Sequence, residues 1–172
     1  MLKIIGALVI LCSCGYAGFS VARDYQRRPK DLRYLQSALQ MLETEISYGA
    51  TPLPDALEQV ANRCDKSVAQ LFLETRNRLL SGDGITAREA LDDTLKKFSR
   101  NSAIKNSDAS VLRALGTSLG ISDREDQVKH LQLAREQLRI EAAKAEEEAA
   151  KNVKLYNYLG VLGGLTIILI FI

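Results

Sequence analysis

Residues 4–22 read IIGALVILCSCGYAGFSVA and residues 155–172 read LYNYLGVLGGLTIILIFI, and neither stretch contains Asp, Glu, Lys, Arg or His. The hydrocarbon core of a bilayer is about 30 Å thick, and a helix that rises 1.5 Å per residue crosses it in roughly 20 residues. All charged residues except Lys3 lie between these two stretches. The pattern therefore predicts one transmembrane helix near each end and a charged segment between them.

Basic residues beside the two stretches predict the orientation, because Lys and Arg are enriched on the cytosolic side of a membrane. Five of them follow the first stretch: Arg23, Arg27, Arg28, Lys30 and Arg33. Four precede the second stretch, and none follows it: Arg139, Lys144, Lys151 and Lys154. Both spans thus predict a cytosolic middle segment. The first group is also a candidate for contact with anionic lipid, although a role as the topology signal explains it equally well.

A cleaved leader is the alternative for the first stretch. Residues 11–14 read LCSC and approach a lipoprotein cleavage box with Cys14 as the acylated residue. However, residues 15–22 stay apolar, whereas a processed lipoprotein begins with a polar linker. Cleavage would also place the middle segment outside the cell, against the prediction from the second span. We therefore favour an uncleaved span.

Two small-xxx-small pairs lie in the predicted spans, Cys14 with Gly18 and Gly160 with Gly164. Such pairs let helix backbones approach closely and are candidates for packing between the spans or between two copies of the chain.

Composition argues against catalysis and against nucleic acid. The formal net charge is +2, and outside the membrane flank the basic residues are dispersed, so no nucleic-acid footprint is present. His130 is the sole histidine, and of the three cysteines only Cys64 lies outside the predicted spans. A zinc site or a Cys/His nucleophile needs more such residues. We expect no catalytic, cofactor or metal residues, and a protein that is not an enzyme.

The middle segment, residues 23–154, is the size of one domain and has helical periodicity throughout. We expect six helices, which begin near Pro29, Thr51, Asp65 or Ser67, Thr86, Ser107 and Ser122. Thr86 with Glu89, and Ser122 with Glu125, have capping-box spacing. The last helix meets no Gly or Pro before Gly160, so it should continue into the second span. The predicted fold is all-α, a six-helix cytosolic bundle (23–154) with one transmembrane helix at each terminus (1–22 and 155–172).

Two polar features are candidates for binding a partner. The cluster Asp123, Arg124, Glu125 and Gln127, with His130 one turn later, is denser than a helix cap requires. Ordinary solvation is the alternative explanation. Tyr48 precedes a Gly and two Pro residues, so it could lie on a rigid exposed loop, or it could pack as apolar cover on the last turn of its helix.

The sequence closely resembles the stage III sporulation protein AB family. Two segments carry the resemblance, residues 28–57, which end in LETEISYGATPLPDAL, and residues 115–131, which read LGTSLGISDREDQVKHL. The likeness extends over essentially the whole chain, including both predicted spans. That family in turn is similar to the cytosolic domains of F-type platform proteins from type II secretion and type IV pilus systems. Those proteins contain two such domains and three spans, whereas this chain has one domain and two spans.

The resemblance implies a non-catalytic platform subunit in a channel or secretion-like complex between mother cell and forespore. The implied partners are a cytosolic secretion-type ATPase of the same sporulation set and the other stage III sporulation membrane proteins. The implied location is the mother-cell membrane around the forespore, and further copies of the chain are possible partners. The alternative function is a structural scaffold that assembles channel subunits through its transmembrane helices without contacting a motor.

Overall fold

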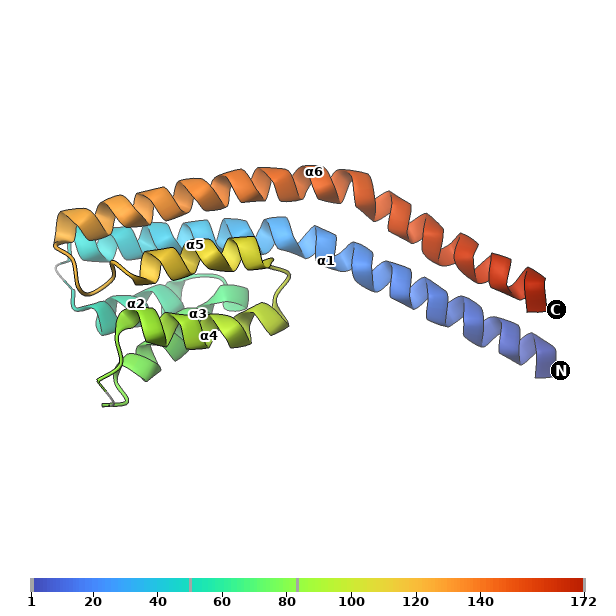
Figure 1. Cartoon of the computed structure of the whole chain (residues 1–172), viewed down its shortest axis with the longest axis horizontal. Helices are drawn as coiled ribbons and strands as arrows, with labels where there is room; N and C mark the ends of the chain where they lie inside the picture. Colours follow the sequence, from blue (N-terminus) through green and yellow to red (C-terminus); the bar gives the residue numbers. More distant parts are fainter. Residues whose placement is uncertain (1, 50, 83, 172) are drawn as a thin grey trace. The chain divides into compact units, whose positions relative to one another are not determined.

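The structure, a computed structural model, describes residues 2–49, 51–82 and 84–171, and the side chains of these except at 2–12, 14, 17, 157, 159–161 and 163–171. The described residues form six helices and no strand: α1 (Leu2–Ser47), α2 (Leu53–Arg63), α3 (Lys66–Leu79), α4 (Ala87–Asn101), α5 (Asn106–Gly116) and α6 (Arg124–Phe171) (Figure 1). The all-α class is confirmed. The middle segment has the six predicted helices, but the first of them is not separate from the amino-terminal stretch, because both belong to α1. The chain divides into two compact units, Arg28–Ala143 and the residues on either side of it.

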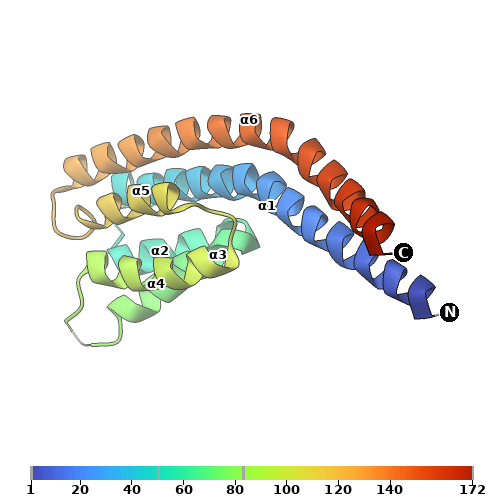
Figure 2. The ribbon, with the colours of Figure 1, turned by 45° about the vertical axis from the view of Figure 1, so that its right-hand side comes forward.

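We call Arg28–Ala143 the helical bundle. Within it, α1 and α6 lie side by side and α2 to α5 stack against them (Figures 1 and 2). Apolar residues spaced by three and four supply the buried faces of the two long helices: Leu32, Leu35, Leu39 and Leu42 on α1, and Leu131, Ala134, Leu138 and Ala142 on α6. Each fully buried leucine contributes about 1.5–3 kcal/mol. The core is therefore the one that the helical periodicity predicts.

The short helices α2 to α5 each contribute a buried stripe to the same core, among them Leu57, Val60, Leu71, Phe72, Leu95 and Leu112. Gly116 lets α4 and α5 approach closely. A Cβ there would lie 3.2 Å from Leu91 Cδ2 and 3.3 Å from the Cα atom of Arg88. A larger residue at this point would push the two helices apart.

Helix starts follow the predicted caps in part. Thr86 and Glu89 form the predicted capping box, and Asp65 caps α3. The predicted box of Ser122 and Glu125 is wrong. Asp123 instead accepts a hydrogen bond of 2.8 Å from the amide N–H of Asp126, so the cap lies one residue later. An ionised carboxylate is at least as good an acceptor at this position as a serine hydroxyl.

Two further caps differ from the prediction. The residue before α2 is Pro52 and not the predicted Thr51, and no side chain makes a capping hydrogen bond there. Before α5 the carboxylate of Asp108 accepts the amide N–H of Lys105 at 2.8 Å, so Ser107 is not the cap.

Pro29 lies inside α1, so the expectation that a helix begins there is wrong. A proline inside a helix costs about 3 kcal/mol because it removes one hydrogen bond and crowds the preceding turn. Here Arg28, Asp31 and Leu32, on either side of it, are all buried in the bundle and hold this part of the chain in place. At the other end of α1, Gly49 continues the helical hydrogen bonds by donating to the carbonyl of Glu45 at 3.1 Å.

The second compact unit contains the first part of α1 and the last part of α6. The rings of Tyr25 and Tyr156 stack in it, with centroids 5.6 Å apart and planes at 20°. Large apolar side chains stay exposed among its described residues, including Tyr16, Phe19, Tyr158 and Leu162. Over the described residues, no helix reaches the length and apolarity that a membrane crossing requires.

The predicted packing pairs of the spans fall mostly outside this description. The side chains at Cys14, Gly160 and Gly164 lie outside the described residues, and Gly18 is half-buried. The packing of these pairs stays a prediction.

Candidate partner-binding surfaces

Arg28 lies inside the bundle, 4% exposed, and not at a lipid surface as its place among the flanking basic residues predicted. Its Nε and Nη2 atoms donate to the two carboxylate oxygens of Asp108 at 3.0 and 2.9 Å, and Nη2 also donates to Glu141 at 3.0 Å. The planar guanidinium matches a carboxylate in this two-bond geometry. With both partners inside the bundle, Arg28 cannot serve as a lipid contact.

Of the other four flanking residues, Arg23, Lys30 and Arg33 are exposed and Arg27 is half-buried. These four remain candidates for contact with anionic lipid.

The ion pair also fixes the loop between α4 and α5. Asp108, which is fully buried, bonds Arg28 and the amide of Lys105 at once. Asp31, on the turn of α1 that follows Arg28, accepts the amide N–H of Ala103 at 3.2 Å. Buried carboxylates need such partners, because an unpaired buried charge is strongly destabilising. Two acidic side chains thus hold this loop against α1.

The first candidate surface is at the end of the bundle where α1 ends and α6 begins, which we call the tip. A hollow of about 230 Å³ opens there, lined by Ile46, Thr51, Pro52, Leu53, Gly120, Arg124 and Gln127. Tyr48 and Ile121, which flank lining residues in sequence, are 87% and 69% exposed. The interpretation of Tyr48 as apolar cover is therefore wrong. The amide of Tyr48 still donates to the carbonyl of Thr44 at 3.0 Å, so the helical turn continues through it. Its ring lies in solvent because a residue two positions after the buried Ile46 projects from the opposite side of the helix.

The residues of the predicted polar cluster have different roles in the structure. Arg124 and Gln127 line the hollow, whereas Asp123 caps α6. Gln127 also accepts from the amide of Gly120 and donates to the carbonyl of Ser122, so it braces the loop before α6. Glu125 is exposed beside the hollow without lining it, and His130 is exposed one turn along α6.

Ile121 belongs to the tip and was not predicted. The signal for it was an isolated apolar residue between Gly120 and Ser122, outside any helical stripe.

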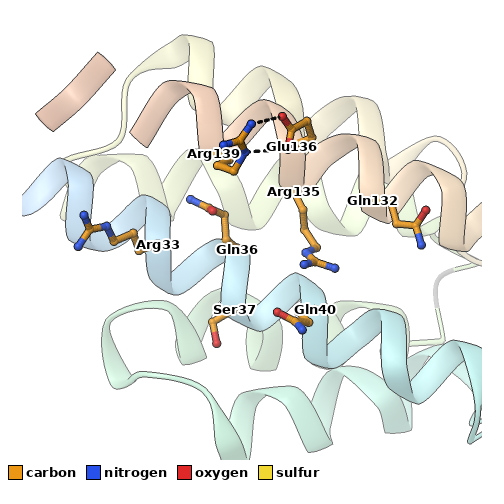
Figure 3. A pocket seen from close by; sticks show the side chains of 8 residues that line it. All are labelled: Arg33, Gln36, Ser37, Gln40, Gln132, Arg135, Glu136 and Arg139. Carbon is orange, nitrogen blue, oxygen red and sulfur yellow. Dashed lines mark hydrogen bonds and ion pairs between the residues drawn. The ribbon is translucent and has the colours of Figure 1, made fainter. Parts of the chain in front are cut away.

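The second candidate surface is a groove of about 500 Å³ between α1 and α6, which we call the basic groove (Figure 3). Eight residues line it: Arg33, Gln36, Ser37 and Gln40 from α1, and Gln132, Arg135, Glu136 and Arg139 from α6. Sequence reasoning missed it, although both helices repeat the same spacing of three, one and three residues. That spacing places four side chains on one face of a helix.

A mixed-charge surface lies between α4 and α5. Asp92 accepts from Arg113 at 2.8 Å and pairs with Lys96 at 2.9 Å. The hydrogen bond from Lys96, followed by that from Arg113, lowers the pKa of the Asp92 carboxyl below its usual value despite some desolvation. Lys96 also pairs with Asp93 at 3.4 Å. Across the part of the chain that the structure describes, no three His, Cys, Asp or Glu side chains are grouped to hold a metal ion.

Comparison with known proteins decides the family. The family model described as "Stage III sporulation protein AB" matches residues 3–172. The chain belongs to the stage III sporulation protein AB family. The protein of that description from Bacillus subtilis (strain 168) is 41% identical over 170 residues, which cover 99% of both chains. A solved structure of a stage III sporulation protein AB is 39% identical, with a TM-score of 0.66, and the match covers 72% of this chain and 96% of that one. The resemblance drawn from the sequence is confirmed.

Proposed function

We propose that the chain is a non-catalytic membrane platform subunit of a sporulation channel or secretion-like complex. In this proposal the bundle is cytosolic and docks a secretion-type ATPase through the tip. Membership of a sporulation family supports the setting. The observation that carries the docking role is the tip itself. Arg124 lines its hollow, and the two chain segments that supply the other lining residues also expose Tyr48 and Ile121.

The chemistry of the tip favours protein recognition. Aromatic, large aliphatic and arginine side chains are enriched at protein interfaces, and those that fill a pocket contribute most of the binding energy. The tip combines the apolar side chains of Tyr48 and Ile121 with the guanidinium of Arg124, so it fits a partner that supplies an apolar anchor and a carboxylate.

Helix continuity supports a mechanical role. Both α1 and α6 run unbroken from the bundle into the other compact unit. A helix carries a push or a rotation along its axis because each turn is hydrogen-bonded to the next. Movement imposed on the tip by a motor would reach the other unit through these two helices.

Membrane insertion of the terminal segments is part of the proposal. It rests on the two uncharged stretches, on the flanking basic residues and on the exposed apolar side chains of Tyr16, Phe19 and Leu162. Exposed apolar surface of this kind needs lipid or another protein to cover it.

The test is co-purification of the full chain, in membranes, with the secretion-type ATPase of the same sporulation set after mild crosslinking. The double variant Tyr48→Ala/Arg124→Glu should reduce the recovered ATPase at least tenfold, as the loss of one interface hot spot does. The matched control is Arg78→Glu/Leu80→Ala, which changes an arginine and an apolar residue that are also exposed, near the end of α3. The control should recover the ATPase within twofold of the unchanged chain.

Two results would overturn the docking role: no association with the ATPase at all, or equal recovery by both double variants. The scaffold alternative makes a different prediction. If the chain works only through its membrane helices, replacing residues 1–22 and 155–172 by unrelated spans should abolish recovery of the other sporulation membrane proteins. The platform proposal expects ATPase binding by that chimera to persist.

A further inference from the structure

The basic groove has an uneven distribution of charge along its length. Arg33 and Arg139 lie toward one end, Arg135 and Gln40 are nearer the middle, and Gln132 occupies the other end (Figure 3). Glu136 is the only acid among the lining residues, so the lining carries a net charge of +2. One end of the groove therefore attracts carboxylates, and the other presents neutral amides that both donate and accept hydrogen bonds.

Two arginines of the groove pair with carboxylates, and the more exposed of these pairs can be exchanged. Arg139 makes two hydrogen bonds to Glu136 at 2.8 and 2.6 Å, and Arg135 pairs with Glu43. The Arg139 and Glu136 side chains are 69% and 52% exposed. Exposed pairs of this kind contribute at most about 1 kcal/mol. Replacing Glu136 by the carboxylate of a partner would therefore cost little, and the partner would add contact area.

Apolar side chains border the groove. Leu133 and Ile140 are 54% and 45% exposed and directly follow Gln132 and Arg139. Because they are seven residues apart, they share the face of α6 next to the groove. Tyr34 occupies the corresponding place on α1, directly after Arg33, and is 37% exposed. A partner seated in the groove would meet apolar contacts on both sides.

From this arrangement we infer that the basic groove is the docking site for an acidic, amphipathic helix of a partner protein. Its carboxylates would bond Arg33, Arg135 and Arg139, and its apolar residues would cover Leu133 and Ile140. The lining runs over eight residues of each wall, about two turns. That length matches the i, i+4 and i+7 anchors by which a helix lies in a groove.

Protein fits this surface better than lipid. Recognition of anionic headgroups uses clusters of roughly four to eight Lys or Arg. The groove has three arginines together with three glutamines and a serine. Neutral amides and exposed apolar side chains around a few arginines are instead the composition of a protein interface. The inference is independent of motor docking, which uses tip residues.

The test places a photo-crosslinking amino acid at Ser37, an exposed and uncharged lining residue, in the full chain in membranes of sporulating cells. Ser110, exposed on α5, carries the same group as the position control. The segment joined to Ser37 is then identified by mass spectrometry. We expect a protein segment of net negative charge, recovered at least fivefold above the Ser110 control and weakened by 0.5 M salt, on the order of the salt sensitivity of exposed charge contacts.

Charge reversal in the groove should remove the adduct. Arg33→Glu/Arg139→Glu should lower its yield at least fivefold, whereas Arg78→Glu, which breaks an exposed pair with Asp93, should leave it within twofold. Circular dichroism of the variants checks that the helices persist. Three outcomes would overturn the inference: an adduct with lipid alone, an adduct with a neutral or basic segment, or no adduct above the Ser110 control.

Discussion

Replacing Asp108 by Asn should destabilise the bundle more than any other single change of an acid to its amide. The side chain of Asp108 is fully buried and that of Arg28 is 5% exposed, so the pair is shielded from water. The substitution keeps the size of the side chain but removes its charge. It also turns one of the two acceptor oxygens into an NH2 group, which faces a donor of Arg28 in either orientation and, in one of them, the amide of Lys105 as well.

The size of the effect follows from what remains for Arg28. Breaking a buried ion pair by removing one partner costs about 3–5 kcal/mol, because the other charge is left without compensation. Glu141, 20% exposed, still contacts Arg28 at 3.0 Å and offsets part of that loss. We therefore expect the free energy of unfolding to fall by about 3 kcal/mol, at the lower end of that range. For a unit of this size the midpoint of thermal unfolding should fall by about 12 °C.

The assay is urea and thermal unfolding of the full chain in detergent micelles, followed by far-ultraviolet circular dichroism. Asp92→Asn is the matched control, since Asp92 also pairs with an arginine but is 37% exposed. It should cost no more than about 1 kcal/mol. Arg28→Met/Asp108→Leu should lose less stability than the two single changes together, because neither charge is left alone. Equal small losses for Asp108→Asn and Asp92→Asn would refute the reasoning.

Three other predictions concern the helices. Hydrogen bonds from the amide and hydroxyl of Thr86 lower the pKa of the Glu89 carboxyl, so its stabilisation is complete above the ordinary pKa and is lost as the pH falls through the lowered value. The free energy of unfolding in urea should therefore be lower for Glu89→Gln than for the unchanged chain at pH 7, and the two values should converge in acid. A difference that stays constant with pH would contradict this. The hydroxyls of Thr75 and Thr94 lie 2.8 Å apart in the core, so changing either residue to Val should lower the free energy of unfolding by about 1 kcal/mol. The double change should lower it by less than the sum of the two single losses, and additive losses would contradict this coupling. Gly49→Ala should lower the free energy of unfolding by about 1–3 kcal/mol, because a Cβ would lie 2.7 Å from the backbone carbonyl oxygen of Glu45. An unchanged urea midpoint would count against that contact.

The fold was predictable because it depends on local patterns. Apolar residues at spacings of three and four, such as Leu131, Ala134 and Leu138, define a face whatever lies opposite it. The continuity of α6 followed from the lack of Gly and Pro over a long stretch. Cap positions were less predictable, because Ser122 and Asp123 are both good caps and the choice depends on the loop before them.

The site was less predictable because its residues are distant in sequence. Arg28 and Asp108 are 80 positions apart, and nothing local marks either as buried. The walls of the basic groove are likewise recognised only when α1 and α6 are known to be neighbours. At the tip, the polar residues were predicted as a group, but the exposure of Tyr48 and Ile121 depends on where α1 and the loop before α6 end.

The contacts of Arg28 set the axial register of α1 in the bundle. Its two carboxylate partners come from α5 and α6, so three helices meet at one guanidinium. If α1 slid by one turn, about 5.4 Å, the guanidinium would lose its partners and Asp108 would be left as a lone buried charge. Gradual slippage is therefore unfavourable, and the bundle should answer a pull on α1 as one rigid body. Displacement of the α1 segment inside the bundle would therefore carry α5 and α6 with it.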